Sequence, residues 1–114
     1  MEFLNWKNYR SALLDRINAF AKLSPDSVNG YLALANAGAK TGHLDEKTRQ
    51  LISLAVAVTT RCDGCISDHA QLAADAGASK EQIAEALGVA IAMNAGAALV
   101  YSVRALDAVD HVKK

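Results

Sequence analysis

The sequence predicts an all-α fold, a compact domain of about six helices that spans residues 1–114 and forms oligomers. Two observations lead to this prediction. Helix stop and start signals follow one another closely along the chain, and the single proline stands at one of these breaks. A chain of 114 residues has the size of one domain and is expected to bury about two-thirds of its unfolded surface. Its core would therefore be modest, and contact with a partner subunit would enlarge it.

The first break lies in "LSPDS". Ser24 can cap a helix, and Pro25 suits the first helical turn because its missing N–H would have no intrahelical partner there. We expect one helix to end near Lys22 and the next to begin at Pro25.

Gly42 is the next stop signal, and a helix is expected from about Asp45 to Arg61. Acidic residues at its start and a basic residue at its end complement the helix macrodipole. The β-branched run "LAVAVTT" could also form a strand, because a short apolar run is ambiguous by periodicity alone. The flanking signals favour a helix.

A further helix should carry "CDGCISDHAQLAADAG" and stop at Gly77. Ser79 and Gln82 then form a capping box that opens the next helix. The stretch that follows, Ala86–Val103, is long enough to cross a bilayer and carries no charge. Because it is rich in Ala and Gly and has Asn94 near its middle, we interpret it as two closely packed helices, buried in the domain and against another subunit.

The charge of the chain limits the classes of partner that we expect, and its N-terminal sequence indicates a cellular compartment. Lys and Arg number 12, as do Asp and Glu, and no basic cluster stands out, so we expect neither nucleic acid nor a membrane as a partner. The opening "MEFLNWKNYR" has no apolar core of a secretory signal, which favours the cytoplasm. A CxxC pair in that compartment indicates catalytic or metal-binding thiols.

Both cysteines and one histidine lie in "RCDGCISDHAQL". On a helix, Cys62, Cys65 and His69 would share one face, and Cys62 would lie at the helix start, where unpaired N–H groups stabilise a thiolate. Asp63 and Asp68 should point elsewhere as solvated acids.

Three explanations remain for this motif. A zinc site would need a fourth ligand, which His43 or His111 would have to supply. Buried structural cysteines are a second explanation, and dithiol redox chemistry, which needs neither metal nor cofactor, is the third. We favour the third, because chance is a poor explanation for two cysteines at CxxC spacing with a histidine one turn further on.

Thiolate formation alone would not make this pair an efficient peroxidase. Lowering a cysteine pKa from about 8.5 to about 6 raises the thiolate fraction at neutral pH roughly thirtyfold. Nucleophilicity falls roughly tenfold at the same time, so the net gain is about two- to threefold. A general acid contributes roughly a hundredfold or more, and His69 is the obvious member of such a proton relay.

Residues 44–106, from "LDEKTRQLISLAVAVTTRCDGCISDHAQ" to "VYSVRAL", strongly resemble the core of the AhpD-like alkylhydroperoxidases of the carboxymuconolactone decarboxylase superfamily. The resemblance implies an all-helical trimer or hexamer that reduces organic hydroperoxides. By the same resemblance, Cys65 attacks the peroxide and becomes a sulfenic acid, Cys62 donates a proton and closes the disulfide, and His69 relays protons. A lipoylated protein or a peroxiredoxin is implied as a redox partner.

One position departs from this family pattern. Members usually have a glutamate twelve residues before the first cysteine, and this chain has Gln50, which cannot shuttle a proton. Gln50 could still orient His69. Glu46, one turn earlier, could reach the site in place of the missing acid, although we expect it to face water.

The departure keeps other functions open. A disulfide oxidoreductase or a redox sensor without efficient peroxide turnover is the main alternative. Decarboxylation, the activity that names the superfamily, is a weaker one, because the members that perform it generally lack the CxxC pair.

Overall fold

The computed structural model describes residues 1–112, and in that range it contains five helices and no strand. The all-α prediction is confirmed, with five helices in place of about six. Their bounds are α1 (Trp6–Leu23), α2 (Pro25–Thr41), α3 (Glu46–Thr60), α4 (Asp63–Asp75) and α5 (Lys80–Val112).

The predicted proline and glycine breaks are confirmed. The last residue of α1 is Leu23 and the first of α2 is Pro25, one residue from the expected end and at the expected start. At the end of α2, Gly42 adopts a left-handed conformation with φ of 76°, which a residue with a side chain would adopt only under strain.

The helix expected from Asp45 to Arg61 is also confirmed, so the strand alternative is wrong. The Asp45 carboxylate caps α3 by accepting the Thr48 N–H at 2.8 Å. At the other end Arg61 has φ of 54°, a left-handed residue that lets the chain turn into α4 within two residues.

The capping box before α5 forms as expected. The Ser79 hydroxyl accepts the Gln82 N–H, and the Gln82 side chain accepts the Ser79 N–H, both at 3.0 Å. Gly77, with φ of 85°, stands two residues after the last residue of α4, as the predicted stop.

The prediction of two helices within Ala86–Val103 is wrong, because α5 is one helix of 33 residues. Asn94 does not break it. Its side-chain amide donates to the Ala90 carbonyl of the same helix at 2.8 Å and to the Thr59 hydroxyl of α3 at 2.9 Å. The surrounding alanines are strong helix formers, and their preference outweighs the cost of single Asn and Gly residues.

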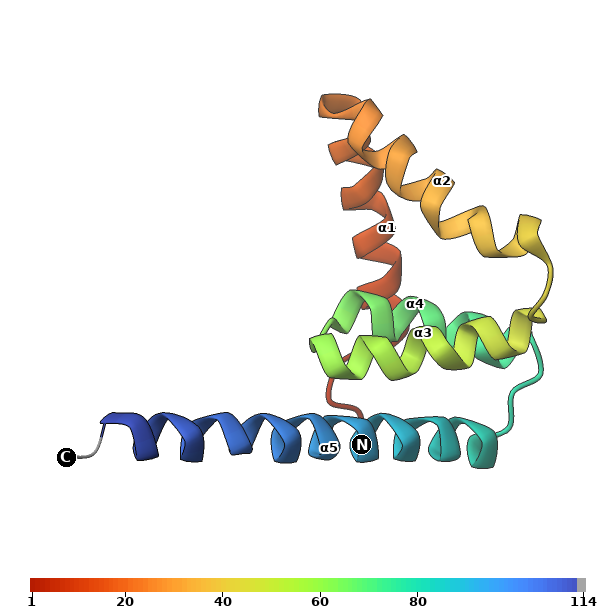
Figure 1. Ribbon diagram of the computed structural model, residues 1–114. Coiled ribbons are helices and arrows are strands. Elements are labelled where there is room, and N and C mark those ends of the chain that lie inside the picture. The colour runs from red at the N-terminus through yellow and green to blue at the C-terminus, as the bar shows by residue number, and fades with distance from the viewer. Residues whose placement is uncertain (113–114) are drawn as a thin grey trace.

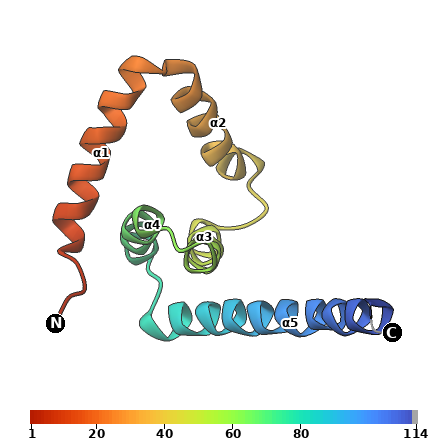
Figure 2. The ribbon, with the colours of Figure 1, turned by 90° about the vertical axis from the view of Figure 1, so that its left-hand side faces the viewer.

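The helices are arranged around the α3–α4 pair. α3 packs against both α4 and α5, whereas α1 packs against α4 and α2. Figure 2 shows α3 and α4 end-on, with α1 and α2 forming an open V on one side and α5 running along the other. The C-terminal half of α5 extends well past the other helices (Figure 1).

The single chain is more open than the compact domain predicted from its length. Its radius of gyration is 18.5 Å, against about 13 Å for a compact domain of this size. Its accessible surface is 8991 Å², against about 6000 Å² for a compact protein of this mass. The buried apolar residues in the described chain are Leu54, Ala57, Ala73 and Ala90.

α5 accounts for much of this exposure, since Ala90 is its only buried residue. The expectation that its apolar stretch is buried within the domain is therefore wrong for the single chain. By length and composition, α5 is also the one helix among the described residues that could cross a membrane. Core helices of soluble proteins meet the same criterion.

Candidate dithiol site

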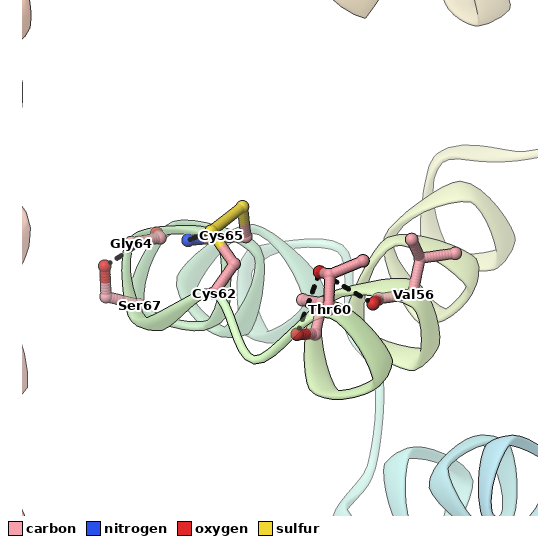
Figure 3. The surroundings of a disulfide bond; sticks show 7 residues. Val56, Thr60, Cys62, Gly64, Cys65 and Ser67 are labelled. Atoms are coloured by element: carbon pink, nitrogen blue, oxygen red, sulfur yellow. Dashed lines mark hydrogen bonds between the residues drawn. A yellow bond between two sulfur atoms is a disulfide. The ribbon is translucent and has the colours of Figure 1, made fainter. Parts of the chain in front are cut away.

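Cys62 and Cys65 are joined by a disulfide at the start of α4, with their Cα atoms 5.2 Å apart (Figure 3). Cys62 is the N-cap residue, as expected for a cysteine at the helix start, and Cys65 lies in the first turn. The Cys65 N–H donates to the Cys62 sulfur at 3.1 Å. This sulfur therefore lies where the helix N–H groups would stabilise a thiolate after reduction.

His69 lies one turn further along α4 and is held by a residue of α3. Its Nδ1 is 2.6 Å from the Gln50 side-chain oxygen. Gln50 is 8% exposed, one of two buried polar residues in the described chain. The position of the usual family glutamate is thus in direct contact with the predicted relay histidine.

Glu46 forms a hydrogen bond with the other end of the Gln50 side chain. The Gln50 amide nitrogen donates to Glu46 Oε1 at 2.8 Å, and Arg49 donates to Glu46 Oε2 at 2.7 Å. The hydrogen bond from Arg49, followed by the one from Gln50, holds the pKa of the Glu46 carboxyl below its ordinary value. Glu46 is exposed, as expected, but it is also joined to His69 through one amide.

Gly64, between the two cysteines, allows α1 to approach the site. A Cβ atom at Gly64 would lie 2.7 Å from Leu13 Cδ2, a separation that real Cβ atoms essentially never show. Leu13 therefore packs directly on the CxxC turn. The buried Ser67 hydroxyl supports the same turn by donating to the Gly64 carbonyl at 2.9 Å (Figure 3).

The expectation that Asp68 is a solvated acid is wrong. Asp63 is exposed as expected, but it does not point away from the site, because it lines the same cavity as the two cysteines. Asp68 Oδ1 accepts a hydrogen bond from Nε of Arg10 in α1 at 3.0 Å, and it forms an ion pair with a terminal nitrogen of the same guanidinium at 2.9 Å. The two residues are 58 positions apart, so no local signal in the sequence could have indicated the pair.

The disulfide and His69 line a cavity of about 730 Å³. The Arg10–Asp68 pair lies on the same cavity, and most of the remaining wall is apolar and comes from α1 and α2. These wall residues are Leu13, Leu14, Ile17, Phe20, Val28, Tyr31 and Leu32. The α1 and α2 contribution was missed from the sequence, because neither helix carries a motif.

The other two histidines lie away from this motif in the chain. His43 precedes α3 and His111 is in the last turn of α5. Within residues 1–112, no group of three or more His, Cys, Asp or Glu side chains is placed to hold a metal ion.

The sequence model of the carboxymuconolactone decarboxylase family matches residues 25–108, a range that includes α3, α4 and the whole CxxC motif. This chain belongs to the carboxymuconolactone decarboxylase family. The resemblance to its AhpD-like branch is consistent with that membership.

Two relatives and a solved structure extend the comparison. An uncharacterized protein of Haemophilus influenzae is 51% identical over 106 residues, covering 93% of this chain and 94% of its own. Uncharacterized protein 4 in the cox locus of Paracoccus denitrificans is 43% identical over 84 residues, covering 74% and 76%. The crystal structure of an apo carboxymuconolactone decarboxylase family protein from Legionella pneumophila superposes with a TM-score of 0.73 at 35% identity, covering 96% and 97%.

Proposed function

We propose that this carboxymuconolactone decarboxylase family member is a thiol-dependent peroxidase that reduces organic hydroperoxides. The supporting observation is one juxtaposition: a disulfide-forming pair at a helix N-terminus shares an apolar cavity with a histidine. The pair supplies two electrons, the histidine exchanges protons, and the cavity accommodates an apolar organic group.

The proposed reaction begins with the reduced pair. The Cys65 thiolate attacks the terminal oxygen of the hydroperoxide, the O–O bond breaks, and the alkoxide takes a proton through His69 and leaves as an alcohol. Cys65 is now a sulfenic acid. The Cys62 thiol attacks its sulfur, the S–S bond forms, and water leaves. Two thiols and one hydroperoxide thus give one disulfide, one alcohol and one water.

The wall of the cavity supports an organic substrate over hydrogen peroxide. Leu13, Leu14, Ile17 and Phe20 offer an apolar surface in the cavity that the two cysteines also line. The charge of Arg10 is compensated by its ion pair with Asp68, and Asp63 is a further acid at the cavity. An uncharged alkyl or aryl hydroperoxide suits this lining.

Turnover needs a dithiol that re-reduces the disulfide by thiol–disulfide exchange. By resemblance to the AhpD-like branch, we propose a lipoylated protein as the redox partner that donates electrons, and a peroxiredoxin as a redox partner that the reduced pair can re-reduce. The proposed working form is a cytoplasmic homotrimer or homohexamer.

One observation favours a second candidate function. Gln50 places an amide beside His69, so the relay lacks the acid that family members usually have there. A disulfide oxidoreductase or redox sensor needs only exchange at the cysteine pair, and this chemistry would tolerate the amide.

A turnover assay separates the two functions. The reduced protein is mixed with cumene hydroperoxide and then supplied with dihydrolipoamide, while alcohol formation and free thiols are followed together. Repeated alcohol formation at a rate proportional to enzyme supports the peroxidase. Disulfide formation without repeated turnover supports the sensor, and rapid exchange with protein disulfides without peroxide consumption supports the oxidoreductase.

A further inference from the structure

Three side chains form a chain of hydrogen bonds that leads from the surface to the candidate site. The exposed Glu46 accepts from the Gln50 amide nitrogen at 2.8 Å, and the buried Gln50 oxygen lies 2.6 Å from His69 Nδ1. The first two residues belong to α3 and the third to α4, so this series of hydrogen bonds joins two helices.

Each of these two hydrogen bonds has a fixed donor and a fixed acceptor. An ionised carboxylate can only accept, and the hydrogen bond from Arg49 helps to keep Glu46 ionised by lowering its pKa. Gln50 must therefore turn its NH₂ group to Glu46 and its carbonyl to His69. A carbonyl also only accepts, so His69 Nδ1 must carry a proton.

The direction determines which ring nitrogen can act as a base. A neutral imidazole carries one proton, so with Nδ1 protonated the other nitrogen, Nε2, is the proton acceptor. Without a carboxylate at position 46, the Gln50 amide could present either end to the ring, and both tautomers would be populated. A hydrogen bond to a charged group shifts such an equilibrium about tenfold or more.

We propose that Glu46 is a positioning residue that acts through Gln50 to hold His69 as the Nδ1–H tautomer, with Nε2 as the proton acceptor at the dithiol site. Glu46 does not carry protons itself. Its kinetic consequence rests on the proposed peroxidase function, whereas the tautomer of His69 does not.

The direct test is the imidazole ¹⁵N spectrum of the whole protein, recorded with the imidazole rings neutral. The His69 signals are assigned by their loss in His69→Ala. We expect a protonated Nδ1 and an unprotonated Nε2 in the parent, and exchange-averaged nitrogens in Glu46→Gln. Asp45→Asn is the matched control: it removes a carboxylate from the same helix end but keeps an N-cap residue, and should leave the His69 spectrum unchanged. A parent ring protonated at Nε2, or the same tautomer in Glu46→Gln, overturns the proposal.

A kinetic arm tests the consequence for proton transfer. Disulfide formation by cumene hydroperoxide should slow about tenfold in Glu46→Gln and stay within twofold of the parent in Asp45→Asn. An unchanged rate in Glu46→Gln, with its tautomers mixed, overturns the role in positioning. Absence of peroxide reduction in the parent refutes the proposed function instead, and the tautomer result still decides the proposal about Glu46.

Discussion

The two cysteines occupy unequal positions, because Cys62 caps α4 whereas Cys65 lies inside its first turn. The helix N-terminus lies closest to the Cys62 sulfur, yet the family resemblance assigns peroxide attack to Cys65. Their roles in the reaction should therefore differ, and single substitutions can separate them.

We expect Cys65→Ser to abolish sulfenic acid formation. Cys62→Ser should still form a sulfenic acid at Cys65 but fail to resolve it, because the thiol that closes the disulfide is gone. A sulfenic-selective reagent followed by peptide mapping measures both outcomes. Labelling chiefly at Cys62 in the Cys65→Ser protein would reverse the assignment.

Gln50 is the second residue where the chemistry can be altered. Gln50→Glu should raise hydroperoxide turnover about tenfold, because it restores a titratable group in contact with His69. The new carboxyl would also face Glu46, and repulsion between two carboxylates raises the pKa of one of them. Steady-state rates across pH should therefore show a new ionisation. Unchanged or lower turnover with an intact fold would mean that the site is specialised for disulfide exchange.

At the scale of helices, α1 packs on the CxxC turn through Leu13 and Gly64. Gly64→Ala should gain helix propensity of about 1 kcal/mol. In the parent this gain is offset, because the new methyl group displaces the Leu13 side chain. In a Leu13→Ala background the same change should stabilise the protein by most of that amount. Denaturant unfolding of the four proteins gives the coupling, and additive effects would contradict the contact.

Helix boundaries could be predicted from the sequence because their causes are local. Pro25, Gly42 and the Ser79–Gln82 capping box each act within a few residues, and each lies where expected. The continuity of α5 could not be predicted in the same way. A polar residue within an apolar run predicts a break as readily as a side chain bonded inside a continuous helix, and the contacts of the Asn94 amide with Ala90 and Thr59 are visible only in the structure.

The candidate site likewise has a part that local sequence predicts and a part that depends on how distant helices pack. Spacing alone predicts Cys62, Cys65 and His69 on one helix, with Cys62 at its start. The Arg10–Asp68 pair and the apolar wall from α1 and α2 depend on how distant helices pack, and no motif indicates them. Gln50 was found only because it breaks a family pattern.

At the scale of the whole molecule, α5 carries exposed apolar side chains along much of its length. Ile91, Met93, Leu99, Val100 and Val103 are each more than 60% exposed. An unpaired surface of this extent is typical of a protein interface. The described chain leaves about 3000 Å² more surface exposed than a compact protein of its mass.

We therefore expect a homo-oligomer at micromolar concentration, a trimer or hexamer by family resemblance, in light scattering. Leu99→Lys should shift the mass towards 12.0 kDa, because it places a charge on the apolar surface of α5. Glu85→Lys, on the same helix but at an exposed polar position, is the control and should leave the mass unchanged. A parent protein that is only a soluble monomer would contradict this prediction, and flotation with lipid vesicles would indicate a membrane helix instead.

The open shape of the single chain also has a thermodynamic consequence. If association supplies the burial that one chain lacks, unfolding and dissociation become one reaction that obeys mass action. The melting temperature would then rise with protein concentration, and dilution would act as a destabilising mutation does. The α1 and α2 wall of the dithiol cavity, which packs on α4 chiefly through α1, would be among the first parts to loosen. Protein abundance would in this way set how well the cysteine pair is enclosed.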